Sequence, residues 1–162
     1  MSENQGVTPV PSSGFDRQRT PLDCGRTALA AIARTHGVDC LALDAIDANV
    51  PMSLFEICES AERLGLVAEG VRLRPPRLHH LAERLPCMLL CYSTSPSPST
   101  PFHYLVLTSI ADDAAVIFDP NHGVYAVTTQ RLTNAWTGIA VLFSILDRSP
   151  RPVPRRRHDR QR

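Results

Sequence analysis

The chain contains no lysine: arginine supplies all 17 of its basic residues, against 16 acidic residues in a length of 162. Long apolar runs are also missing, since none approaches the roughly 20 residues that a helix needs to cross a bilayer. The opening sequence, MSENQGVTPVPSSG, has neither the basic nor the apolar segment of a secretory signal. These absences argue against a membrane-spanning or secreted protein, and we expect a cytoplasmic one.

Cysteine occurs five times, an odd number that argues against a disulfide framework in a chain without a secretory signal. A structural zinc site is not expected either, because the closely spaced Cys87 and Cys91 lack a second pair of ligands at the usual spacing. Only Cys24 lies in a pattern that suggests chemistry. The other four are predicted to be small buried packing residues. They are Cys40, Cys58, Cys87 and Cys91.

The length and a hydrophobic content of 43% fit one globular domain. We place this domain at residues 15–146, between a disordered segment at 1–14 and a flexible tail at 147–162 that holds seven of the arginines. The tail has no aromatic residue to stack on bases and no apolar face to enter a membrane. We therefore expect neither a nucleic-acid partner nor membrane binding, and the oligomeric state stays open.

The two halves of the domain differ in the spacing of their apolar residues. Helical spacing predicts helices over residues 24–35, 41–49, 53–64 and 76–84. A capping-box pattern at Ser53 and Glu56 supports the third of them. Strand-like segments follow at residues 87–92, 103–110, 115–118, 124–128 and 138–146. Helices followed by an antiparallel sheet predict an α+β fold.

Cys24 stands where the first predicted helix begins, in the segment LDCGRTALAAI. Asp23 has the residue type of a helix cap, and Gly25 is expected to leave room around the sulfur. The positive end of a helix dipole stabilises a negatively charged sulfur, which is the nucleophilic form. A cysteine that merely begins a buried helix would give the same local pattern, so Cys24 needs partners before it indicates catalysis.

Those partners are offered by His103, at the start of one predicted strand, and Asp119, at the end of the next. If the two strands form a hairpin around Asp112 and Asp113, the two side chains become neighbours. Asp119 can then bind one imidazole nitrogen while the other faces the thiol, as in catalytic triads. Gln18 could direct its amide N–H at a developing oxyanion, beside the backbone N–H of the cysteine.

These residues lie in motifs that resemble those of the bacteriocin-processing, double-glycine leader peptidases. The resemblance covers about residues 15–146 and rests on QRTPLDCGRTALAAIARTHG, SLFEICESAERLGLVAEGVRL, HYLVL, DP and WTGIAVLF. It implies a papain-like fold in which Cys24 is the nucleophile, His103 the base, Asp119 the orienting residue and Gln18 part of the oxyanion hole. It implies no cofactor.

In that family the peptidase domain stands at the N-terminus of bacteriocin ABC exporters or exists as a free-standing protein. The chain has no room for an exporter's other domains, so the resemblance implies the free-standing form, with an ABC exporter as a possible partner in trans. The implied reaction is removal of a leader after a Gly-Gly-like site. Two alternatives stay open: a papain-like amidase, deamidase or acyltransferase acting on another protein, and a non-catalytic peptide-binding module of an export system.

Overall fold

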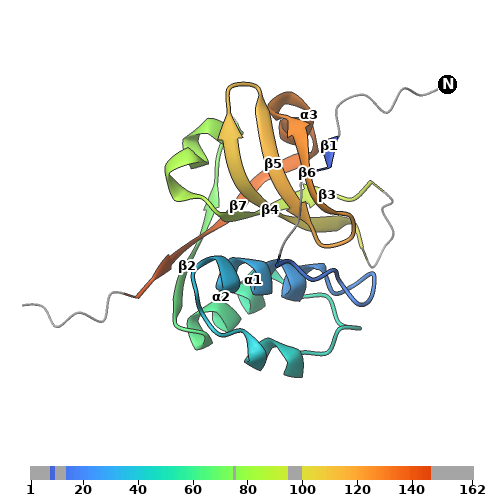
Figure 1. The fold of residues 1–162 in the computed structure, drawn as a ribbon, viewed down its shortest axis with the longest axis vertical. Coiled ribbons are helices and arrows are strands. Elements are labelled where there is room, and N and C mark those ends of the chain that lie inside the picture. The colour runs from blue at the N-terminus through green and yellow to red at the C-terminus, as the bar shows by residue number, and fades with distance from the viewer. Residues whose placement is uncertain (1–7, 10–13, 75, 95–99, 147–162) are drawn as a thin grey trace, which may run out of the picture.

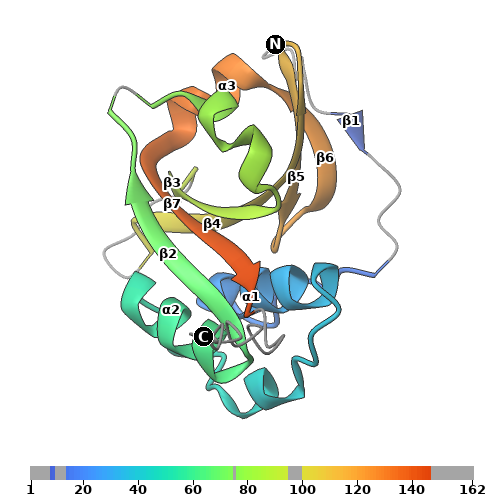
Figure 2. The same ribbon diagram turned by 90° about the vertical axis from the view of Figure 1, so that its left-hand side faces the viewer.

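The computed structural model describes residues 8–9, 14–74, 76–94 and 100–146. Its helical elements are α1 (Cys24–Thr35), η1 (Leu41–Ala45), α2 (Leu54–Arg63), η2 (Leu78–Arg84) and α3 (Thr129–Ala135). Its strands are β1 (Thr8–Pro9), β2 (Leu66–Arg72), β3 (Cys87–Tyr92), β4 (Phe102–Ala111), β5 (Ala114–Asp119), β6 (Gly123–Thr128) and β7 (Trp136–Ile145). Figures 1 and 2 show α1 and α2 together on one side of the strands.

The strands form a single sheet of seven, in the order β1-β6-β5-β4-β3-β7-β2, and every neighbouring pair is antiparallel. Successive side chains of a strand point to opposite faces of a sheet. In β4 this places Tyr104 and Val106 against the helices α1 and α2, and Leu105 and Leu107 against a second core. That second core also holds apolar residues of η2 and α3. Burial on both faces explains why this strand is a continuous apolar run.

Several local predictions are confirmed. Ser53 and Glu56 form the predicted capping box at the start of α2, with the Ser53 backbone N–H donating to Glu56 Oε2 at 2.7 Å. Gly65 follows this helix with φ +91°, a conformation that favours glycine. The hairpin between β4 and β5 turns at Asp112 and Asp113, as predicted, because Ala111 pairs directly with Ala114.

The prediction of helices followed by strands was wrong at two places. Strand β2 lies between α2 and η2 in sequence and pairs with β7 along its whole length. It escaped prediction because only Leu66 of its residues is buried, so it has no clear alternation of apolar and polar side chains. Helix α3, which buries only Leu132, was missed for a similar reason. The helix expected over 41–49 is a shorter 3-10 helix, η1.

The predicted tail at 147–162 lies outside the described residues, and so does most of the predicted disordered segment at 1–14. Within that segment, Thr8 and Pro9 pair with Ala126 and Tyr125 of β6. The longest helix of the described chain, α1, has 12 residues, and none of the described helices is long and apolar enough to cross a membrane.

Candidate active site

Cys24 is the first residue of α1 and is 9% exposed. The turn that precedes it is fixed by a buried ion pair. Arg26 Nε and Nη2 donate to the two carboxylate oxygens of Asp23 at 2.6 and 2.5 Å, and the Arg19 backbone N–H donates to the same carboxylate. Burial opposes the charge of Asp23, but these hydrogen bonds hold the pKa of its carboxyl below the ordinary value. The turn and the first residues of α1 are therefore held together by one carboxylate.

One expectation for this turn was wrong. Asp23 occupies the position of a helix cap, but its side chain makes no capping hydrogen bond because Arg26 engages both oxygens. Gly25 has a packing role that was not predicted. A Cβ at Gly25 would come within 3.1 Å of Met52 Cβ and 3.4 Å of Tyr104 Cδ2, so the glycine allows α1 to pack closely against these residues.

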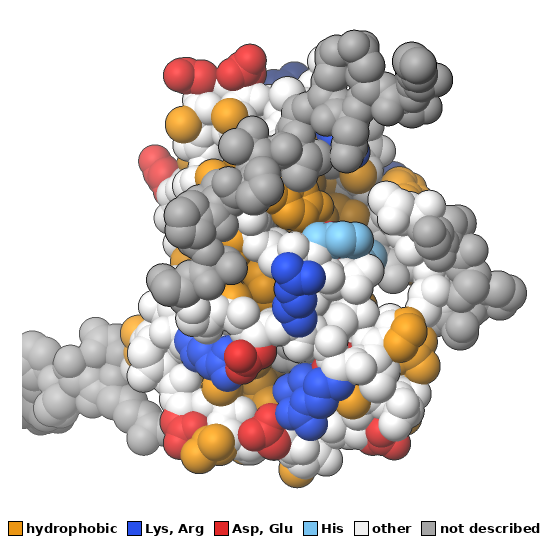
Figure 3. All heavy atoms as spheres, turned by 45° about the vertical axis from the view of Figure 1, so that its right-hand side comes forward, with side chains coloured by type: hydrophobic (Ala, Val, Ile, Leu, Met, Phe, Trp, Pro, Cys, Tyr) orange, Lys and Arg blue, Asp and Glu red, His pale blue; other side chains and the backbone are white. Residues whose placement is uncertain are grey.

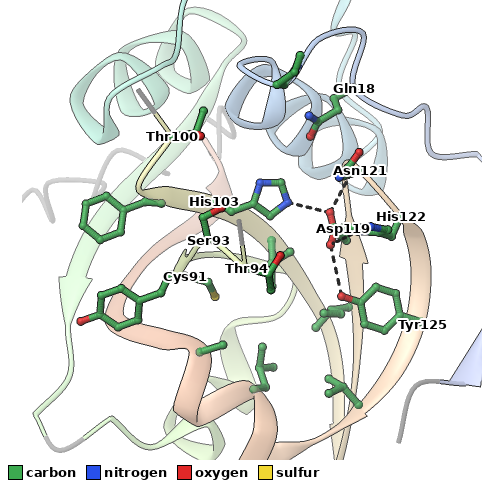
Figure 4. A pocket seen from close by; sticks show the side chains of 18 of the residues that line it. Gln18, Cys91, Ser93, Thr94, Thr100, His103, Asp119, Asn121, His122 and Tyr125 are labelled. Carbon is green, nitrogen blue, oxygen red and sulfur yellow. Dashed lines mark hydrogen bonds and ion pairs between the residues drawn. The ribbon is translucent and has the colours of Figure 1, made fainter. Parts of the chain in front are cut away.

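His103 and Asp119 meet as the hairpin predicts. His103 Nε2 lies 2.8 Å from Asp119 Oδ1, and both side chains are largely buried, at 22% and 8% exposed. Figure 4 shows the His103 ring with Asp119 on one side and its second nitrogen turned away from that carboxylate. The second nitrogen, Nδ1, is thus left for Cys24, which is near enough to affect the charge of this ring.

The electrostatics of the pair favour a charged imidazole. Burial opposes protonation of His103, but its hydrogen bonds with Asp119 and Cys24, and their charges, raise its pKa to about 9. Burial likewise opposes the charge of Asp119, but the His103 and His122 side chains and the Asn121 backbone N–H lower its pKa to about 2. An imidazolium beside a carboxylate is therefore the favoured state at neutral pH.

Asp119 has further partners that the sequence analysis did not identify. The Asn121 backbone N–H donates to Oδ1 at 2.8 Å. On the other oxygen, His122 Nδ1 lies 3.0 Å away and the Tyr125 hydroxyl donates at 3.4 Å (Figure 4). The sequence signal for these contacts is the turn DPNHG, because an aspartate at the start of a turn can accept hydrogen bonds from the residues that follow it. Together they fix the carboxylate with one oxygen facing His103.

Gln18 is brought to the same place by the backbone. Its N–H donates to the carbonyl of Pro120, the residue after Asp119, at 2.8 Å. Its side-chain Nε2 donates to the carbonyl of Thr20 at 2.8 Å, whereas Oε1 is buried and has no hydrogen-bond partner. The Thr20 hydroxyl in turn donates to the carbonyl of Ala48. An amide NH2 group has two protons, so one of them stays available for another acceptor.

A cavity lies on each side of this group. The smaller, the Cys24 cavity, has a volume of about 250 Å³ and mostly apolar walls that include Leu22, Met52 and Tyr104. The larger, the His103 cavity, has a volume of about 570 Å³ and is lined by Gln18, His103 and Asp119 together with apolar residues of the sheet. Pro21 and Phe102 line both cavities, so the two adjoin at the catalytic candidates.

Basic and acidic side chains are interspersed on the face of the molecule shown in Figure 3. Ion pairs join some of the charged side chains of the described surface: Arg34 with Asp16 at 2.7 Å and Arg19 with Asp44 at 2.8 Å. Among the residues that the structure describes, no group of three or more His, Cys, Asp or Glu side chains could hold a metal ion. What the site offers is a thiol, a charged imidazole and hydrogen-bond donors, which suits nucleophilic acyl chemistry.

The other thiols differ from Cys24 in their surroundings. Burial raises the pKa of Cys87 to about 12, and burial with the charge of Asp119 does the same for Cys91. Burial and Glu62 also raise the pKa of Cys58. All four are free thiols. Cys87 and Cys91 are buried in the core as predicted, whereas Cys40 and Cys58 are only partly buried and pack against it.

We expect iodoacetamide at neutral pH to alkylate Cys24 faster than any other cysteine of the folded protein, because only Cys24 is paired with an imidazole. Peptide mapping by mass spectrometry would measure the five rates. In a His103→Ala variant the preference for Cys24 should disappear. Equal alkylation of Cys24 and Cys40 in the unaltered protein would contradict the pairing of Cys24 with His103.

Comparison with known proteins identifies a family and several solved structures that are similar to this chain. The model of the peptidase C39 family matches residues 13–146. A double glycine motif protease from an AMS/PCAT transporter, solved in complex with the leader peptide, is 21% identical with a TM-score of 0.64, over 88% of this chain and 96% of that one. The peptidase domain of Streptococcus ComA, a bi-functional ABC transporter, is 20% identical with a TM-score of 0.65, over 80% and 96%.

The N-terminal peptidase C39 like domain of a toxin secretion ATP-binding protein from Vibrio parahaemolyticus is 21% identical with a TM-score of 0.59, over 76% of this chain and 97% of that one. Comparison with curated proteins gives no match. The solved structures share the fold of this chain, which confirms the predicted α+β, papain-like arrangement of helices against an antiparallel sheet.

Proposed function

The chain belongs to the peptidase C39 family, and we propose that it is a cysteine endopeptidase that removes the leader from a ribosomally made peptide. Cys24 supplies the attacking sulfur, His103 moves the protons and Asp119 orients and stabilises the imidazolium. The observation that carries this proposal is the His103 ring, which Asp119 holds through Nε2 at 2.8 Å so that Nδ1 is left for Cys24.

The reaction follows from these contacts. The Cys24 sulfur attacks the carbonyl carbon of the scissile bond, and the carbonyl oxygen becomes an oxyanion. His103 then gives the Nδ1 proton to the leaving amine, which departs and leaves a thioester on Cys24. A water molecule gives its proton back to His103 and attacks the thioester, which releases the leader. Nε2 stays on Asp119 throughout, so only Nδ1 exchanges protons with the substrate.

The oxyanion is stabilised by two donors in this proposal, the Cys24 backbone N–H and one Nε2 proton of Gln18. Thr20 supports the assignment, because its carbonyl binds the other Nε2 proton and so determines which way the amide faces. Without that carbonyl the amide could rotate, and a donor that must reorganise stabilises charge less well than a fixed one.

Gln18→Ala is therefore expected to lower kcat by about 100- to 1000-fold, the usual effect of losing one oxyanion donor. The matched control is Gln130→Ala, since Gln130 is an exposed glutamine of α3 far along the chain. Steady-state kinetics on one peptide would compare the two variants. An unchanged kcat in Gln18→Ala would remove Gln18 from the oxyanion hole without affecting the role of Cys24.

A leader that ends in a Gly-Gly-like pair fits the surroundings of the sulfur. Because Cys24 is only 9% exposed, a substrate must approach it closely, and residues without side chains can do so most easily. The Cys24 cavity, with Leu22 and Met52 in its walls, can hold an apolar side chain from further along the leader. The related double glycine motif protease, solved with a leader peptide, supports the same class of substrate.

An ABC exporter acting in trans is the partner that this proposal implies, because two of the related peptidase domains come from transporters. The test of the proposal needs no exporter. A synthetic peptide with an amphipathic leader, a Gly-Gly pair and a short core would be incubated with the protein and analysed by mass spectrometry.

We expect one cut, after Gly-Gly, and no cut in a control peptide in which valines replace the two glycines. A product deamidated or acylated rather than cleaved would contradict the peptidase and favour another thioester reaction. Cleavage of both peptides at the same rate would contradict the Gly-Gly-like specificity.

The pH dependence follows from His103. The leaving amine needs the imidazolium proton, and the contacts with Asp119 and Cys24 raise the pKa of that imidazole from 6.5 to about 9. We therefore expect kcat/KM to fall as the pH rises through about 9. The same linkage makes the contribution of His103 to folding stability complete below 6.5 and lost as the pH rises through about 9.

Measured pH profiles of kcat/KM and of chemical unfolding would check both statements. A kcat/KM that falls near pH 6.5, the ordinary pKa of histidine, would contradict the pairing of His103 with Asp119 and Cys24. Asp119, whose pKa is lowered to about 2, should cause no loss of rate until the pH falls toward that value.

A further inference from the structure

The His103 cavity has no role in the mechanism so far, although it is the larger of the two, at about 570 Å³. Protein interiors are close-packed, and voids larger than a water molecule are few. Its volume falls in the range of cavities that bind small ligands or parts of large ones. Its position next to the imidazole suggests that the reaction uses it.

The proposed mechanism gives the two cavities different places along the substrate. The acyl part of the peptide stays on Cys24, while the leaving amine receives its proton from His103. Of the described residues, Cys24 lines only the smaller cavity and His103 only the larger. The chain that follows the scissile bond must therefore begin at the His103 cavity. Pro21 and Phe102, which line both, mark where the substrate would pass from one to the other.

The walls of the His103 cavity determine what could occupy it. Its apolar part comes from the second core of the sheet: Leu105 and Val127 are 6% exposed, and Ile117 and Leu132 are 2% exposed. The remaining lining is polar, and at the catalytic end the Tyr125 hydroxyl donates to Asp119 while Gln18 Oε1 has no hydrogen-bond partner, so the apolar part provides the walls for a substrate side chain. An apolar side chain gains by leaving water for such walls, whereas a charged one would lose its hydration.

We propose that the His103 cavity binds the side chain of the first residue after the scissile bond, and that it favours a large apolar residue there. This inference rests on the proposed function for the direction of the substrate. The residues that follow the cleavage site then contribute to specificity, in addition to the leader itself.

The first test compares two peptides with the same Gly-Gly leader that differ only in the next residue, leucine or glycine. We expect kcat/KM to be about tenfold higher or more for the leucine peptide, in line with the effect of apolar groups in enzyme pockets. In a Thr94→Trp variant the difference should vanish, because Thr94 is exposed and lines the cavity, which the indole would fill. The Thr94→Ser variant, which keeps the space, should retain it.

A second measurement does not depend on cleavage. The unaltered protein would be titrated with the released products Leu-Ser-Ala-amide and Gly-Ser-Ala-amide and followed by methyl NMR. We expect the leucine product to shift the methyl signals of Leu105, Val127 and Leu132, and the glycine product to leave them unchanged.

The two measurements distinguish a failure of the proposed function from a failure of the inference about the His103 cavity. If neither peptide is cleaved but the leucine product shifts these methyl signals, the proposed function fails and the apolar binding site stands. If both peptides are cleaved at equal rates, or if neither product shifts the signals, the inference is overturned. A Thr94→Trp variant that slows both peptides equally would also overturn it.

Discussion

Replacement of Cys24 by alanine is expected to abolish cleavage of a Gly-Gly leader peptide, lowering kcat by at least about 10⁵-fold, while leaving the fold and leader binding intact. Loss of a nucleophile removes the covalent route, and only binding and the oxyanion donors remain. The fold should tolerate the change because alanine is smaller than cysteine and favours a helix.

The measurement is kcat from single-turnover kinetics, together with the Kd for the leader from fluorescence anisotropy. The matched control is Cys40→Ala, since Cys40 is half-buried outside both cavities and should matter for packing rather than rate. A Cys24→Ala protein that still cleaves the peptide would contradict the mechanism. A loss of leader affinity as well as rate would point instead to a damaged fold.

The Asp119→Asn variant is expected to lose about 10³- to 10⁴-fold in kcat, because an amide can hold the imidazole in the wrong tautomer and cannot stabilise its charge. The charge of Asp119 also helps to raise the pKa of His103 to about 9. The fall in kcat/KM at high pH should therefore move down toward the ordinary value of 6.5.

Asp113→Asn serves as the control, because Asp113 is an exposed carboxylate in the turn between β4 and β5. It should keep both the rate and the pH profile. If Asp119→Asn lowers the rate without moving the profile, Asp119 supports the structure of the turn rather than the charge of His103.

Much of the fold was predictable because burial leaves a strong local pattern. The apolar run of β4 predicts a strand, and the capping-box residues of α2 predict the start of a helix, each from only a few residues of sequence. Strand β2 is different: it lies at the edge of the sheet, exposes Val67 and Glu69, and is held by pairing with a strand about 70 residues later in the chain. Such long-range pairing outweighs local preference and cannot be read from the segment alone.

The candidate site also contains some contacts that the sequence predicts and others that it does not. His103 and Asp119 were predicted to meet because a hairpin fixes the relation of its two ends, and their 2.8 Å contact confirms it. The partner of Asp23 was not predicted, because a cap and an ion pair with Arg26 are both possible for an aspartate three residues before an arginine. The Thr20 contact with Ala48 depends on how two loops pack, for which the sequence contains no local signal.

The most direct test of the account is the identity of the atom that carries the leader during turnover. The protein would be mixed with the Gly-Gly leader peptide, quenched with acid within the first turnover, digested after arginine and analysed by mass spectrometry. We predict that the segment TPLDCGR, which contains Cys24, carries the added mass of the leader as a thioester. Product formation with this segment unmodified, or with the added mass on another cysteine, would contradict the account.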